Sequence, residues 1–190
     1  GMCLKDNSGH RFMLINSNQP RGRQHFTIAH ELYHLFIEEK PTPHKCNPGY
    51  SKNFVEQSAD MFASLLLMPE SGICQLVPEN ELKTKATILK LEHYFSVSRS
   101  ALLYRLLNIG LISESTRSQF AEVGVKNSAK CFGYDTALYE AANEGLVIGD
   151  FGEKARNLFD KEKISESHYM ELLGKINING TQENENSTRC

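Results

Sequence analysis

The chain has 190 residues, 40% of them hydrophobic and 23% charged, which is typical of a globular protein that buries one sizeable core. Its formal net charge of −2 argues against direct nucleic-acid binding, because domains that bind a phosphate backbone are usually basic. No two of the five cysteines form a C-x-x-C pair, and no apolar run is long enough for a secretory signal or a membrane span. These features lead us to expect a cytoplasmic protein with reduced thiols and no membrane contact.

The first predicted element is a short apolar strand at 11–16, followed by a turn. Apolar residues at helical spacing then predict a helix over 24–39, which must end before Pro41. A second helix is predicted over 51–68, ending before Pro69, and a proline-rich irregular loop separates the two.

A predicted helix at 83–95, a short turn and a helix at 99–108 follow, in an arrangement like a helix-turn-helix. Ser98 is well placed to cap the second of these helices. That helix carries mainly leucine and alanine, whereas a DNA-recognition helix presents polar and basic side chains to the groove. We therefore expect the pair to pack within the protein rather than to bind DNA.

The C-terminal third of the sequence has weaker patterns. Residues 114–130 are polar and give no clear assignment, while helices are predicted at 134–143, 154–159 and 165–176. From residue 177 onward the chain is rich in Asn, Glu, Ser and Thr and is predicted to be disordered.

Two histidines, His30 and His34, lie four residues apart in the predicted 24–39 helix. With about 3.6 residues per turn they are separated by about 40° around the axis and about 6 Å along it, so both imidazoles can reach one zinc ion. Glu31 follows the first histidine, and in the H-E-x-x-H motif this carboxylate acts on the water at the metal rather than on the metal itself. The rest of the helix is largely apolar, which favours a covered site over a solvated face.

A third ligand is expected from the second predicted helix, where Glu56 and Asp60 occupy positions i and i+4. The simplest assignment makes Glu56 the third zinc ligand, with Asp60 accepting the ring N–H of a ligand histidine. Two acidic residues on one face of a helix more often point into solvent than take part in a metal site. Here the same helix carries an apolar stripe that includes Ala59 and Phe62, which favours a packed site.

Two stretches, RQHFTIAHELYHL at 23–35 and EQSADMFASLLLMP at 56–69, resemble the ImmA/IrrE family of metallopeptidases. The later FSVS at 95–98 fits the same pattern, and the resemblance covers roughly residues 9–112. It implies a gluzincin-like zinc site with these residues: His30, His34 and Glu56 as ligands, Glu31 as general base, and Asp60 as the carboxylate behind a ligand histidine. It also implies a bacterial hydrolase whose protein substrate is a regulator, often a helix-turn-helix repressor.

Tyr33 stands where the family usually has glycine, and we expect this ring to pack beside the site. A tetrahedral intermediate needs a hydrogen-bond donor besides the metal. The candidates are Tyr33, Tyr50, His25 and His44, and their spacing singles out none of them.

The expected fold is α+β and mostly helical. We expect a minimal zincin-like core with a small β element at 1–80, a helical pair packed on it at 81–112, a C-terminal helical extension at 113–176 and a disordered tail at 177–190. The expected function is zinc-dependent peptide hydrolysis. The alternative is a non-catalytic, zinc-containing regulatory protein that acts with a repressor, although a purely structural zinc site has no need of Glu31.

Overall fold

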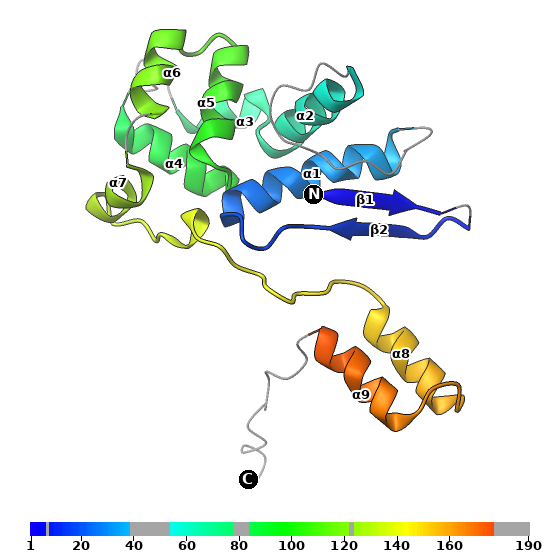
Figure 1. Ribbon diagram of the computed structural model, residues 1–190. Helices are drawn as coiled ribbons and strands as arrows, with labels where there is room; N and C mark the ends of the chain where they lie inside the picture. The colour runs from blue at the N-terminus through cyan, green and yellow to red at the C-terminus, as the bar shows by residue number, and fades with distance from the viewer. Residues whose placement is uncertain (7, 39–53, 78–83, 122–123, 177–190) are drawn as a thin grey trace, which may run out of the picture. The chain divides into compact units, whose positions relative to one another are not determined.

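A computed structural model describes residues 1–6, 8–38, 54–77, 84–121 and 124–176 (Figure 1). The predicted loop at 39–53, with His44 and Tyr50, and the predicted tail at 177–190 lie outside the described residues. The protein is mostly helical with one small antiparallel sheet, which confirms the predicted α+β class. It divides into two units, residues 1–142 and 143–190, which are described separately below. The finer division predicted at residues 80, 112 and 176 stays a prediction.

The described elements of the first unit are β1 (Met2–Lys5), β2 (Arg11–Leu14), α1 (Arg21–Phe36), α2 (Phe54–Leu67), α3 (Glu70–Leu76), α4 (Lys85–Phe95), α5 (Arg99–Asn108), α6 (Glu114–Ala121), α7 (Val125–Cys131) and a short 3-10 helix, η2 (Ala137–Tyr139). The second unit contains α8 (Phe151–Asp160) and α9 (Glu166–Lys175). Among all described helices, none is both long and apolar enough to cross a membrane.

Strands β1 and β2 form an antiparallel hairpin that runs alongside α1 (Figure 1). The sequence analysis predicted β2 but missed β1. In the pair Cys3–Met13, both side chains are at least partly buried, whereas the alternate pairs Met2–Leu14 and Leu4–Phe12 are exposed. The inner face of the hairpin is thus the one that packs on α1.

Helices α1 and α2, which carry the predicted ligands, pack against each other. Their buried positions include small side chains: Ala29 is 2% exposed, and Ala59 and Ala63 are fully buried. Small residues at a helix contact let the two backbones approach closely, which brings longer side chains from both helices to a common point.

The main apolar core lies among α3, α4, α5 and α6, together with the residues that follow α2 and α3. Its buried members are Met68, Ile73, Val77, Ile88, Leu91, Val97, Leu102, Leu103, Leu106, Ile112 and Phe120. The predicted bounds of α5 are confirmed, and the Ser98 side chain accepts a hydrogen bond from the backbone N–H of Ala101 as an N-cap should. The helical pair is therefore a packing element of the first unit.

The first turn of α1 lies directly against the turn between α4 and α5. A Cβ atom added at Gly22 would lie 2.7 Å from the backbone nitrogen of Ser98 and 2.8 Å from the carbonyl carbon of Val97. One turn later, His25 donates from Nδ1 to the carbonyl oxygen of Ser96 at 2.7 Å. These contacts fix the start of the ligand-bearing helix on the helical pair.

The prediction of a helix at 134–143 is wrong. This segment forms only the short η2, followed by an extended stretch. Asp135 accepts a hydrogen bond from the backbone N–H of Ala137, which favours a turn over a continuing helix. The extended stretch then bonds to the start of α1: Arg21 N–H donates to the carbonyl of Glu140 at 3.0 Å, and Gln24 donates from Nε2 to that of Ala142 at 2.9 Å. Tertiary hydrogen bonds have replaced those a helix would make.

A buried polar network joins α4 and α5 to the segment that contains η2. Glu92 is fully buried and Arg99 is 6% exposed, and the Arg99 guanidinium donates to both carboxylate oxygens of Glu92. The Tyr139 hydroxyl donates to Glu92 Oε2 at 2.6 Å, and burial raises the pKa of this phenol. His93 stacks on Tyr134 with ring centroids 4.4 Å apart. The network gives the buried charge of Glu92 several partners.

In the second unit, α8 and α9 confirm the helices predicted at 154–159 and 165–176, with small differences at their ends. The rings of Phe159 and Tyr169 stack across the pair with centroids 5.0 Å apart. Ser165 caps α9 by accepting from the backbone N–H of His168. By contrast, α3, α6 and α7 were not predicted, since each is short and lacks a strong apolar period.

Candidate metal centre

Helix α1 places three residues of the H-E-x-x-H motif inside the protein. His30 is 4% exposed, and Glu31 and His34 are fully buried. Polar side chains of this kind are rarely buried unless they are paired, hydrogen-bonded or bound to a metal. The motif helix therefore points its polar residues into the interior.

Glu56, in the first turn of α2, meets both histidines. Its Oε2 atom lies 3.4 Å from His30 Nε2, and its Oε1 atom lies 3.5 Å from His34 Nε2. The two Nε2 atoms are 3.1 Å apart. The candidate ligand atoms of these three residues lie within 4.8 Å of one another, so the set could hold a metal ion. The structure thus brings together the three residues that the sequence proposed as ligands.

The opposite ring nitrogen of each histidine faces a carboxylate. His30 Nδ1 lies 2.8 Å from Asp60 Oδ1, and His34 Nδ1 lies 2.6 Å from Glu38 Oε2. An ionised carboxylate can only accept, so each Nδ1 carries a proton, and each ring turns its Nε2 atom toward Glu56.

Two imidazole Nε2 atoms and a carboxylate consequently face one another in a buried place. A divalent cation satisfies all three at once, and two nitrogens with one carboxylate oxygen are a common donor set for such ions. The residues present therefore fit a metal ion.

Glu31 has an unusual environment for a carboxylate. It is fully buried, and neither of its oxygens has a hydrogen-bond partner within the described part of the chain. The amino group of Gly1 forms an ion pair with Oε1 at 3.9 Å, a distance too long for a hydrogen bond. A buried carboxylate without a hydrogen bond is costly, which makes Glu31 a candidate for a functional role.

Cys3 of β1 lies beside this carboxylate, a proximity that the sequence did not suggest. The residue is 7% exposed. Burial raises the pKa of its thiol to about 12, and the neighbouring Glu31 carboxylate adds to the shift. In this environment the thiol stays protonated at neutral pH and is a poor nucleophile.

Tyr33 and His25, two of the candidate donors for an oxyanion, are engaged in packing and helix contacts. The Tyr33 ring lies between His34 and Phe62, with centroids 5.8 Å from each. His25 is bonded to Ser96 as described above. His44 and Tyr50, the other two candidates, lie outside the described residues.

Glu38 is the residue near the centre that the sequence analysis overlooked. A signal was present, since Glu38 follows His34 by four residues, the same spacing that relates Glu56 to Asp60.

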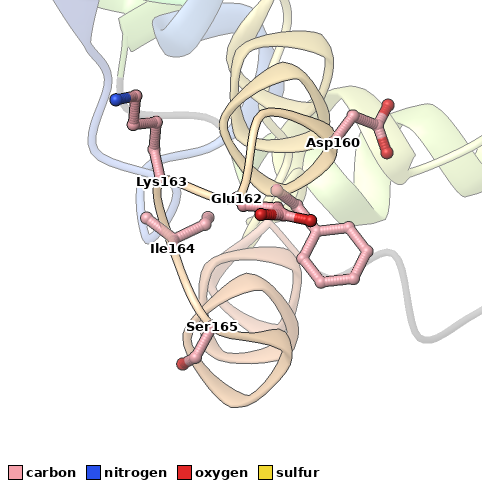
Figure 2. A pocket seen from close by; sticks show the side chains of 6 residues that line it. Asp160, Glu162, Lys163, Ile164 and Ser165 are labelled. Atoms are coloured by element: carbon pink, nitrogen blue, oxygen red, sulfur yellow. The ribbon is translucent and has the colours of Figure 1, made fainter.

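A shallow hollow lies in the second unit, at the turn between α8 and α9 (Figure 2). Its lining consists of Phe159, Asp160, Glu162, Lys163, Ile164 and Ser165. In Figure 2 the Lys163 and Asp160 side chains extend in different directions, so their charges do not converge on one ligand. We assign no catalytic role to this hollow.

The comparisons with known proteins bear on the first unit. The model of a peptidase family described as the IrrE N-terminal-like domain matches residues 3–107, just over half of the 190-residue chain. No curated protein and no solved structure matches the chain. The matched region contains both ligand-bearing helices and all of α5 except its last residue.

Proposed function

The chain belongs to the IrrE N-terminal-like peptidase family, and from this premise we propose that it is a zinc-dependent metallopeptidase. One observation supports the proposal most strongly: His30, His34 and Glu56 meet in a buried place, beside a buried Glu31 without a hydrogen-bond partner. In a purely structural zinc site the fourth position is filled by another ligand, and a free carboxylate beside it has no use.

In this proposal His30, His34 and Glu56 hold the ion, and Asp60 orients His30. When bound there, zinc supplies Lewis acidity that polarises the peptide carbonyl and acidifies a water molecule. The three ligands leave a position open for the substrate and water.

Glu31 is the proposed general base. Its carboxylate removes a proton from the attacking water, and the resulting carboxylic acid then donates that proton to the nitrogen of the leaving amine. Burial keeps bulk water away from this carboxylate. Glu31 is thus unchanged after one turnover, and the peptide has gained one water molecule.

The proposed substrate is a regulatory protein such as a helix-turn-helix repressor, and the proposed compartment is the cytoplasm. Both come from the family resemblance. The alternative is a regulator that holds zinc but hydrolyses nothing.

The decisive experiment compares the wild-type protein with Glu31→Gln. The variant keeps the size of the side chain but cannot act as a base. Bound zinc is measured by mass spectrometry after purification without chelators. Both proteins are then incubated with the helix-turn-helix protein encoded nearest to the gene and with unfolded casein.

We expect zinc in both proteins and cleavage by the wild type alone. If the wild type and Glu31→Gln both hold zinc and neither cleaves a substrate, the result would favour the non-catalytic regulator. Wild-type protein that holds no zinc, even after zinc is added, would contradict the proposed function.

A further inference from the structure

His34 is fully buried, and its Nδ1 atom donates to Glu38 Oε2 at 2.6 Å. We propose that Glu38 is a positioning residue of the metal centre, which fixes the tautomer and the ring orientation of His34. The proposal rests on the proposed zinc site. It adds a second carboxylate to the one contributed by Asp60.

The two carboxylates differ in their surroundings. The Asp60 side chain is 41% exposed, whereas that of Glu38 is 16% exposed and its histidine partner is fully buried. Water competes less for a hydrogen bond in a buried place, and the lower local dielectric strengthens the electrostatic attraction. The Glu38 contact is therefore the stronger constraint of the two.

The end of α1 explains how Glu38 reaches His34. The backbone N–H groups of Ile37 and Glu38 both donate to the carbonyl oxygen of Tyr33, at 2.8 Å and 3.0 Å. This shared acceptor tightens the chain as the helix ends and holds Glu38 over the last helical turn. The Tyr33 ring, edge-on to His34, covers the same imidazole. The carboxylate is therefore placed by the backbone at the end of α1.

The chemical consequence concerns which nitrogen of His34 can bind a metal. With its Nδ1–H bound to Glu38, the ring turns its Nε2 atom toward Glu56 and toward the proposed metal position. Without the carboxylate, the ring can take the other tautomer, whose Nε2–H cannot bind a metal. Loss of such a partner usually weakens metal binding by about 10- to 100-fold.

The first test measures zinc affinity by competition with a chromogenic chelator. Glu38→Ala is expected to lower the affinity about 10- to 100-fold. Glu38→Gln retains an oxygen that can accept a hydrogen bond from Nδ1 of His34, so its zinc affinity should fall much less. Glu171→Ala removes an acid that is 62% exposed in the second unit, and it should bind zinc like the wild type.

The second test reads the His34 tautomer in the metal-free protein at pH 8, from the ¹⁵N chemical shifts of its ring, assigned with His34→Gln. We expect the Nδ1–H form in the wild type and in Glu38→Gln, and a shift toward the Nε2–H form in Glu38→Ala. Wild-type affinity and tautomer in Glu38→Ala would overturn the proposal. Should the wild type bind no zinc, the proposed function fails, while the tautomer measurement still decides whether Glu38 orients His34.

Discussion

Arg105 of α5 donates from its Nε atom to the carbonyl oxygen of Met68, 3.0 Å away, and both residues are buried. Met68 directly follows α2. The guanidinium therefore satisfies a buried carbonyl at the end of a ligand-bearing helix. This hydrogen bond ties α5 to the C-terminal end of α2 without contacting any candidate ligand.

Arg105→Met should therefore destabilise the protein although it preserves an apolar stem. An unsatisfied buried carbonyl costs about 1–3 kcal/mol. Urea unfolding followed by circular dichroism measures the change. Arg105→Lys can still donate a hydrogen bond to the Met68 carbonyl, so it should lose less stability than Arg105→Met. Equal stability of the wild type and Arg105→Met would show that the Met68 carbonyl needs no donor.

Gly22→Ala should lower stability, although alanine normally favours a helix over glycine by about 0.5–1 kcal/mol. The added Cβ would meet backbone atoms of Val97 and Ser98 at 2.7–2.8 Å, and backbone cannot move aside as a flexible side chain can. The matched control is Gly72→Ala in α3, where the nearest atoms lie 3.5 Å away in ordinary contact. Thermal unfolding should show a lower Tm for the first variant and an unchanged or higher Tm for the second. A raised Tm in Gly22→Ala would mean that α1 does not lie so close to the α4–α5 turn.

Removing zinc with a chelator should lower the Tm of the wild type, and added zinc should restore it. A ligand that binds only the folded state stabilises it by about 2.7 kcal/mol at one hundred times its Kd. Glu56→Ala removes one of three ligand candidates and should lose most of this zinc response, whereas Glu70→Ala, an exposed acid on α3, should keep it. Identical melting curves with and without the chelator would argue against a bound metal.

His93 should make stability depend on pH. Its burial lowers the pKa below the usual value of 6.5, although the charges of Glu92 and Asp135 oppose the shift. The unfolded chain then binds a proton more readily than the folded protein, so the free energy of unfolding falls as pH drops below 6.5. Tyr134 and Tyr139 also face this ring, and burial raises the pKa of the Tyr139 phenol.

The measurement is urea unfolding between pH 5 and pH 8 for the wild type and His93→Gln. We expect the difference in unfolding free energy between the two proteins to change across this range, with the wild type losing more stability in acid. A constant difference at every pH would show that His93 titrates alike in the folded and unfolded states.

Local pattern was sufficient to predict much of the site and the fold class. The spacing of His30 and His34 depends only on the geometry of one helix, and the apolar period of α1 is strong enough to predict that helix. The same holds for α5, whose cap and bounds follow from Ser98 and its leucines. The family match is consistent with these local features, because it covers the helices that carry them.

Tertiary structure decided what depends on residues distant in the chain. The meeting of Glu56 with both histidines requires α1 and α2 to pack, and only the packed pair shows Cys3 and Glu38 beside the centre. The segment at 134–143 was predicted as a helix from its sequence, yet the carbonyls of Glu140 and Ala142 accept hydrogen bonds from the start of α1. Propensity is worth tenths of a kilocalorie per residue, and tertiary hydrogen bonds and burial outweigh it in so short a segment.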